Sequence, residues 1–211
     1  MADEFPYDVY PSLIEKQKIL ENYRESIIHL GHSKMGQIGD RISYTDFVML
    51  GIIQRSIELT KGILNLMDQW NLLCAAPLIR LQIDTLLRLT YLSSLDDPEE
   101  ISEKIFKGER INKIKDNEGK KLNDARLRDY ARKSFHWIDE VYENTSKFIH
   151  FSDKHIFTSI IKLNETDRIA YFVIGNGTKN AKEEDIAFYY DVMIQINEGI
   201  SHLITEICNK R

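Results

Sequence analysis

The sequence predicts a mainly α-helical bundle of five to seven helices, with one small antiparallel β-hairpin before the last helix. Several long segments repeat apolar residues with the period of an amphipathic helix. The segment 75–95, AAPLIRLQIDTLLRLTYLSSL, carries apolar residues around almost its whole circumference, which is typical of a central, buried helix. Two runs rich in β-branched and aromatic residues follow late in the chain and favour strands.

The composition predicts one ordered, globular domain over residues 1–211. Hydrophobic residues make up 43% of the chain and charged residues 29%, with four prolines and ten glycines, and this balance argues against disorder. The net charge is −5, the first residues are acidic and aromatic, and no apolar run approaches the roughly 20 residues that span a bilayer. We therefore expect a soluble, cytoplasmic protein with no membrane partner.

The two cysteines, Cys74 and Cys208, lie far apart in the sequence and belong to no paired-cysteine motif. A disulfide framework or a zinc site therefore has no support, and we expect two free, mostly buried thiols. No set of residues forms a complete signature for a metal or a cofactor, so none is assigned.

The first elements expected are an extended arm, a helix and a loop. Residues 1–11 hold three aromatic residues around two prolines, which predicts an N-terminal arm lying on the domain or on a second subunit. Ser12 is a suitable N-cap for a helix over 13–32, and the glycines of the segment 31–43 indicate a loop. A second helix is expected over 45–70.

The third helix, over 75–95, is expected to form an antiparallel helical hairpin with the second. The break between them is short, and Pro77 suits the first turn of a helix, where its missing N–H costs nothing. Residues 93–97 end the third helix, and a fourth begins at Pro98 and Glu99.

The segment 103–133 is strongly basic. It holds eleven Lys or Arg residues and six acidic residues, a local charge of +5, so the rest of the chain carries −10. We expect it to project from the bundle as a helical arm. Its cations are either solvated or form a face that contacts the phosphates of RNA or of a nucleotide, since clustered Lys and Arg bind nucleic acid independently of its sequence.

The last third of the chain is expected to hold a helix, the hairpin and the final helix. A fifth helix begins at residue 124 or 132 and ends at residue 150. The runs HIFTSIIKL and RIAYFVIG are separated by NETD and predict a hairpin over 155–175, and the final helix follows over 183–208. The second, third, fifth and final helices are expected to form the bundle.

Two stretches carry the candidate site. Arg80 and Asp84 lie one turn apart on the third helix, so charged groups enter a core and need polar partners there. Tyr142, Ser146 and His150 are spaced by four residues and lie on one stripe of the fifth helix. We expect the third and fifth helices to pack side by side, with Tyr142 or His150 hydrogen-bonded within this cluster.

These residues resemble the motifs of a bacterial family of helical proteins of unknown function. Its hallmarks are a small-residue turn, Arg-x-x-x-Glu on a core helix, a downstream Asp-Pro and a later Tyr-x-x-x-Ser-x-x-x-His. The matching residues in this chain are Ala75, Ala76, Arg80, Asp84, Tyr91, Asp97, Pro98, Tyr142, Ser146 and His150. Asp84 stands where the family usually has glutamate.

That family looks distantly like the HEPN group, which includes many RNases of toxin and phage-defence systems. The resemblance implies a helical fold and a function directed at RNA or nucleotides. HEPN RNases use an arginine and a histidine separated by four to six residues in a late helix. This chain has no such pair there, because Lys147 stands before His150, and Arg132 lies one residue too close to His136. The resemblance therefore supports the fold more than nuclease activity.

Three roles are open for His150. In the first it is a buried, neutral imidazole that donates to Asp84 or to a backbone carbonyl, and Arg80 and Tyr142 complete a structural network. In the second it is a general acid or base, with Arg80 stabilising developing phosphate charge. In the third it is a metal ligand together with Asp153 and His155.

Two function classes follow from the sequence, and they leave open whether the protein is an enzyme. The first is an RNA-directed or nucleotide-directed protein of a bacterial defence or toxin–antitoxin system, including a divergent ribonuclease. The second is a non-enzymatic interaction module whose polar core is structural. A homodimer is expected in either class, because apolar helix faces commonly bury their remainder against a second copy. A solvent-connected cleft at Arg80 and His150 would favour the first class, and sealed side chains would favour the second.

Overall fold

The computed structural model describes residues 10–35, 41–150, 152–157, 160–164, 166–172 and 183–210. These ranges contain seven α-helices of eight residues or longer, a five-residue helix, a 3-10 turn and a two-stranded antiparallel sheet. The predicted fold class, a mainly α bundle with a small hairpin before the last helix, is confirmed. Most of the expected N-terminal arm and the segments 36–40 and 173–182 lie outside the described residues.

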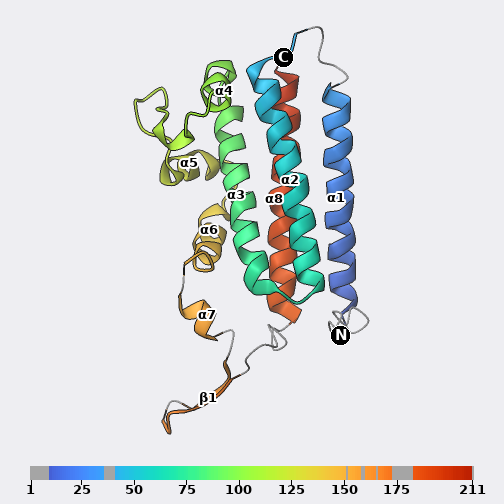
Figure 1. Cartoon of the computed structure of the whole chain (residues 1–211), viewed down its shortest axis with the longest axis vertical. Coiled ribbons are helices and arrows are strands. Elements are labelled where there is room, and N and C mark those ends of the chain that lie inside the picture. Colours follow the sequence, from blue (N-terminus) through green and yellow to red (C-terminus); the bar gives the residue numbers. More distant parts are fainter. Residues whose placement is uncertain are drawn as a thin grey trace.

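Four long helices form the bundle (Figure 1). They are α1 (Pro11–Met35), α2 (Tyr44–Asp68), α3 (Leu72–Ser93) and α8 (Glu183–Asn209). They contact one another in a closed ring, α1 with α2, α2 with α3, α3 with α8 and α8 with α1. Helix α2 runs opposite to the other three, because the chain between α3 and α8 returns along the outside of α3 (Figure 1). No helix in the described ranges combines the length and apolar character needed to cross a membrane.

The membership of the bundle differs from the prediction, which included the fifth helix and left out the first. Leu13, Leu20 and Ile27 follow one another at seven-residue intervals on α1 and are buried, so one stripe of α1 faces the bundle. The expected fifth helix is instead divided into α5 (Asp124–Ala131) and α6 (Ile138–Ser146). Both are too short to run alongside the four long helices.

Helix α3 is the central helix, as predicted. Fifteen of its 22 residues are buried, because α2 and α8 cover one side of it and α5 and α6 cover the other. Helices α2 and α3 form the predicted hairpin, and Asn71 caps α3 by accepting a hydrogen bond from the backbone N–H of Cys74 over 3.2 Å. Since α3 begins at Leu72, Pro77 lies inside the helix and not in its first turn.

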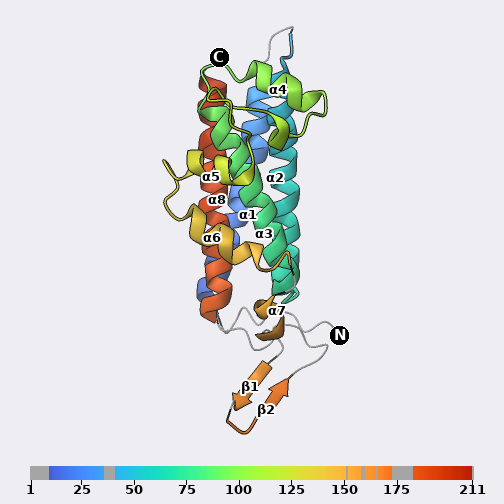
Figure 2. The same cartoon turned by 90° about the vertical axis from the view of Figure 1, so that its left-hand side faces the viewer.

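A second layer of short elements lies outside the bundle (Figures 1 and 2). It consists of α4 (Glu99–Phe106), which packs on α2, the 3-10 turn η2 (Ile111–Lys113), and α5 and α6, which pack on α3. The two helices of the basic segment 103–133 therefore pack on the bundle, and the loop before α5 stands away from it (Figure 1), so the prediction of a projecting helical arm was wrong. Leu122 and Leu127 are fully buried, and α5 packs on α3, so apolar side chains hold this segment against the bundle.

Past one end of the bundle lie α7 (Asp153–Phe157) and the strands β1 (Ile160–Asn164) and β2 (Ile169–Phe172) (Figure 2). The strands pair as an antiparallel hairpin, as predicted. Neither cysteine forms a disulfide; Cys208 is half-buried, but Cys74 is exposed, so the expectation of a buried thiol was wrong at Cys74.

Candidate functional site

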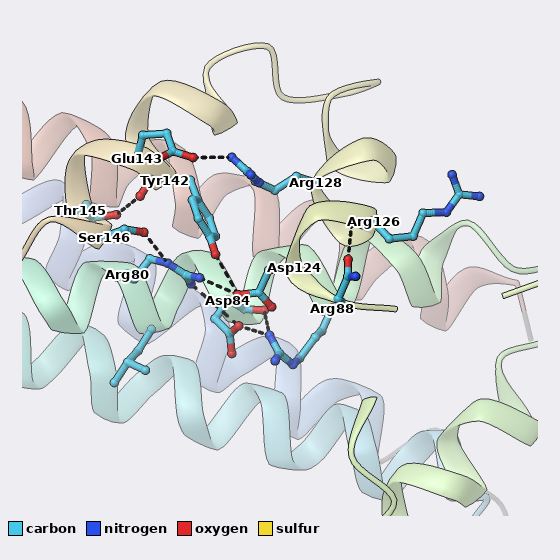
Figure 3. A network of polar contacts seen from close by, with 12 residues as sticks. Arg80, Asp84, Arg88, Asp124, Arg126, Arg128, Tyr142, Glu143, Thr145 and Ser146 are labelled. Carbon is cyan, nitrogen blue, oxygen red and sulfur yellow. Dashed lines mark hydrogen bonds and ion pairs between the residues drawn. The ribbon is translucent and has the colours of Figure 1, made fainter. Parts of the chain in front are cut away.

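Arg80 is the centre of a group of charged and polar side chains between α3, α5 and α6, which we call the Arg80 cluster (Figure 3). Its side chain is 8% exposed, and its guanidinium keeps its charge, so it needs compensating partners. Arg80 Nη2 donates a hydrogen bond to Asp124 Oδ2 over 2.9 Å, whereas Nη1 lies 3.8 Å from Asp84 Oδ1. Asp124 is therefore the principal counter-ion, and Asp84, which was predicted for this role, is the more distant one.

Asp124 is positioned by the start of α5. The side chain of Asn123 caps this helix by accepting a hydrogen bond from the backbone N–H of Arg126 over 2.9 Å. Asp124 thus occupies the first turn, where the helix dipole stabilises a carboxylate. Its side chain is 43% exposed, so one edge of the Arg80 cluster reaches water.

Helix α6 supplies Tyr142 and Ser146, which join the cluster as predicted. The Tyr142 hydroxyl donates to Asp124 Oδ2 over 2.8 Å, and Arg80 Nε donates to Ser146 Oγ over 3.3 Å. Arg80 Cζ also lies 3.8 Å from the centroid of the Tyr142 ring, in a cation–π contact. Burial and then the hydrogen bond to Asp124 raise the pKa of Tyr142, so the phenol stays protonated and continues to donate.

A second guanidinium, that of Arg128, contacts the same aromatic ring. Arg128 Cζ lies 4.3 Å from the ring centroid, and Figure 3 shows Tyr142 between Arg80 and Arg128. Arg128 Nη1 in turn donates to Asp139 over 3.2 Å and to Glu143 over 2.9 Å. Helices α5 and α6 are thus joined to each other as well as to α3.

Asp84 pairs chiefly with Arg88, one turn further along α3. Their side chains form an ion pair, and Arg88 Nη1 also donates to the main-chain oxygen of Asp84 over 2.9 Å. The carboxylate of Asp84 is therefore shared between Arg88 and the more distant Arg80. Arg88 and Arg128 were not among the candidates identified from the sequence.

His150 does not belong to the Arg80 cluster. Helix α6 ends at Ser146, and the backbone then tightens, because two successive N–H groups donate to the carbonyl three residues earlier, each over 3.1 Å. The hydroxyl of Ser152 donates to the main-chain oxygen of Lys147 over 2.7 Å and satisfies the end of the helix. The predicted stripe therefore stops one turn before His150, whose side chain is exposed.

The alternative metal site at His150, Asp153 and His155 is not assembled either. His155 Nδ1 accepts a hydrogen bond from the backbone N–H of Ser152 over 3.2 Å, so this nitrogen is occupied within its own turn. Across the residues that the structure describes, no three or more His, Cys, Asp or Glu side chains are grouped so that they could hold a metal ion.

Ion pairs neutralise much of the basic segment 103–133. Six of its eleven cations are paired, and three of the acidic partners lie outside the segment, so the local charge of +5 overstated its positive field. The pairs are Lys104–Glu100, Lys107–Glu103, Lys120–Glu118, Arg126–Asp116, Arg128–Glu143 and Arg132–Asp139.

Other cations of this segment lie on the loop 110–121, whose backbone is held in place by the buried carboxylate of Asp116. The buried carboxylate of Asp116 accepts hydrogen bonds from two backbone N–H groups of the loop, each over 2.9 Å, and from Arg126 Nε over 2.6 Å. Burial by itself would raise the pKa of Asp116, but these hydrogen bonds and the charge of Arg126 hold it below its usual value. Lys115 and Lys121 face each other across an isolated antiparallel bridge in this loop, and both are exposed.

A second polar group, the Gln82 cluster, lies between α3, α2 and α8 and was missed by the sequence analysis. Gln82 Nε2 donates to Ser56 Oγ over 2.7 Å and to Asn197 Oδ1 over 3.0 Å. Asn197 Nδ2 donates to Thr60 Oγ1 over 3.2 Å, and all four side chains are buried. Isolated polar residues on apolar helix faces carry no sequence signal that they meet in space.

The Arg80 cluster joins α3, α5 and α6, and few of its polar groups remain free to bind a ligand. Asp124 and Asp84 face the terminal nitrogens of Arg80, Ser146 accepts from Nε, and Tyr142 covers one side of the guanidinium. A general acid or base must reach the proton that it transfers. The Tyr142 hydroxyl is engaged with Asp124, and the predicted histidine lies outside the cluster.

Comparisons of the chain with models of known protein families, with curated proteins and with solved structures found no match. The resemblance to a HEPN-like helical family therefore stays a prediction. Asp124, the carboxylate closest to Arg80, is not part of the motif that carries this resemblance.

Proposed function

We propose that this protein is a non-enzymatic interaction module that acts as a homodimer, with the Arg80 cluster in a structural role. The observation that carries the proposal is the enclosure of the Arg80 guanidinium by Asp124, Ser146, the more distant Asp84 and the Tyr142 ring. A phosphate oxygen approaching Arg80 would have to displace Asp124. That displacement breaks an ion pair of a buried guanidinium, which is costly.

The separation of Arg80 and His150 also supports a structural role over a ribonuclease. Catalysis by this pair would need both side chains in one solvent-connected cleft. Arg80 is buried beneath the Tyr142 ring, whereas His150 follows the end of α6 and is exposed. For this reason we favour the non-enzymatic interaction module over the divergent HEPN-like ribonuclease.

Apolar side chains on the surface support an interaction role. Phe47 of α2 and Phe106 of α4 lie with their ring centroids 5.0 Å apart and remain 43% and 54% exposed. Exposed apolar patches on folded proteins commonly mark surfaces that bind other macromolecules.

The test combines RNA cleavage, growth on expression, thermal unfolding and light scattering. We expect neither the wild type nor His150→Ala to cleave RNA or arrest growth, and His150→Ala to unfold at the wild-type temperature. Arg80→Met should unfold at a lower temperature, and the wild type should scatter as a dimer of the 24.7 kDa chain. RNA cleavage that His150→Ala abolishes at unchanged stability would refute the proposal.

A second candidate function is the binding of RNA or nucleotide phosphates by the loop 110–121. Lys115 and Lys121 lie directly opposite each other, and within the described part of the chain neither makes an ion pair. Like charges in such positions repel, and an anionic group between them would relieve the repulsion. Arg110 and Lys113 are exposed on the same loop.

Binding to RNA over a series of salt concentrations tests this candidate. The double variant Lys115→Gln, Lys121→Gln should weaken binding and reduce the slope of log K against log salt by about 1.5. The matched control is Lys104→Gln, Lys107→Gln, which removes the same charge from lysines that are already ion-paired. Equal weakening by both variants would contradict a site at the loop.

A further inference from the structure

The β-hairpin has little support from the rest of the described chain. Its strands pair with each other and lie past the end of the bundle (Figures 1 and 2). The paired residues are Ile160 with Phe172, Lys162 with Tyr171, Leu163 with Ala170 and Asn164 with Ile169. A two-stranded hairpin is at best marginally stable by itself in water, so further contacts are needed to hold it.

The strand register gives the hairpin two chemically different faces. Directly paired residues share a face, and successive residues of a strand alternate between faces. One face, the apolar face, carries Ile160, Leu163, Ala170 and Phe172, and the opposite, mixed face carries Lys162, Asn164, Ile169 and Tyr171. Ile160 and Leu163 are three residues apart and would lie on opposite faces of a regular strand, but the extra residue of the bulge between Ile160 and Lys162 brings them to the same face.

Exposed apolar side chains are concentrated in this part of the molecule. Phe172 is 62% exposed and Leu163 is 43% exposed on the apolar face. Half of the large apolar side chains that are exposed in the described residues lie between positions 149 and 172, namely Ile149, Ile156, Leu163, Ile169, Tyr171 and Phe172. Such a concentration in one short segment indicates a surface that is covered by a partner.

The charge pattern favours a second copy of this chain as that partner. The apolar face carries no charged side chain, so the same face of another copy can cover it without burying a charge. Residues 160–172 contain two basic and two acidic residues, so two hairpins meet without net repulsion although each chain carries −5 overall.

We infer that the apolar face of the hairpin is a dimer interface, in which two copies pack these faces against each other about a twofold axis. The inference rests on the homodimer of the proposed function and names the surface that forms it. Phe172 and Leu163 of each copy occupy the centre, and the mixed face stays in water. Two such faces bury less than the roughly 800 Å² per partner of a standard interface, so the dimer is concentration-dependent.

Sedimentation velocity of the full chain over a concentration series tests the interface. The wild type should approach twice the monomer mass of 24.7 kDa. Phe172→Lys places a charge in the apolar face and should raise the dimer Kd by at least about tenfold, the effect of losing one hot-spot residue. Ile169→Lys puts the same charge on the same strand but on the mixed face, and should leave the Kd unchanged.

Both variants should keep the helical circular dichroism and unfolding temperature of the wild type, because the hairpin lies outside the bundle core. Equal loss of association in Phe172→Lys and Ile169→Lys would overturn the assignment of the face. A dimer that Phe172→Lys leaves intact would overturn the hairpin interface but not the homodimer. A wild type that stays monomeric at every concentration would overturn both.

Discussion

The two polar clusters on α3 use different chemistry on two sides of one helix. Arg80 and Gln82 are two residues apart, a rotation of about 200° around the helix axis, so their side chains point in nearly opposite directions. The Gln82 cluster consists of amides and hydroxyls, all of them buried within the bundle. The Arg80 cluster consists mainly of full charges, and its carboxylate Asp124 reaches solvent.

The difference shows how access to water decides which polar groups a helix interface can hold. A charge that is cut off from water costs several kcal/mol unless it is well paired, whereas amides and hydroxyls satisfy one another at lower cost. The neutral cluster therefore suits the interior, where it fixes α2, α3 and α8 relative to one another. The charged cluster suits the rim, where it attaches α5 and α6 to α3.

Acid should destabilise the layer of α5 and α6 outside α3 before it destabilises the bundle, and this is the largest effect that we expect. Hydrogen bonds hold the pKa of Asp116 below its usual value despite burial, and the hydrogen bond from Arg132 does the same for Asp139. A carboxyl whose pKa is lowered by folding stabilises the protein above its unfolded pKa of about 4. That stabilisation is lost as the pH falls through the folded pKa.

Hydrogen exchange measured from about pH 7 to about pH 3 checks this prediction. The amides of α5 and α6 should lose protection at a higher pH than those of α2 and α8, because the Gln82 cluster holds no titratable group. Asp116→Asn should make the stability of the outer layer less dependent on pH. Simultaneous loss of protection on both sides would contradict the prediction.

Asp124→Ala should give the largest effect of a single substitution, a loss of about 3 kcal/mol in the free energy of unfolding. The change leaves the guanidinium of Arg80 buried, with its nearest remaining carboxylate at 3.8 Å. The control is Asp129→Ala on the same helix, which removes an exposed ion pair with Arg132 and should change stability by less than about 0.5 kcal/mol. Urea unfolding compares the two, and equal losses would show that burial of Arg80 adds nothing.

The parts of this picture that the sequence predicted depend on periodicity along single helices. Apolar residues around the whole of 75–95 predicted a helix covered on both sides, and α3 is covered in this way. The spacing of four between Tyr142 and Ser146 placed both on one stripe, and both contact Arg80. Such patterns need no knowledge of what lies across the interface.

The parts that the sequence did not predict depend on helix ends and on contacts between distant segments. The stripe failed at His150 because α6 stops at Ser146, and no glycine or proline marks that end. Asp124 was noted only as a possible helix start, yet it meets Arg80 across 44 positions of sequence. Counting charges within 103–133 failed for the same reason, since the acids that neutralise it include Asp139 and Glu143 beyond its end.

Tyr142→Phe isolates one hydrogen bond of the Arg80 cluster and should cost about 1 kcal/mol. The ring that contacts Arg80 is kept, and only the hydroxyl that donates to Asp124 is removed. The cost is held to this level because Asp124 is partly solvated and can bind water instead. Tyr23→Phe is the control, since its hydroxyl donates to Glu198 at an exposed site and its loss should cost less in urea unfolding.

Gln82→Met should have the smallest effect, a loss of about 1 kcal/mol or less, although Gln82 is more deeply buried than Asp124. Two donated hydrogen bonds are lost, but Gln82 Oε1 accepts none within the described residues, so an unsatisfied buried acceptor is removed with them. Asn197 keeps its hydrogen bond to Thr60. Combined with Asp124→Ala, the change should add within about 0.5 kcal/mol, because the clusters share no member. If Gln82→Met cost as much as Asp124→Ala in urea unfolding, depth of burial and not charge would govern the energetics of α3.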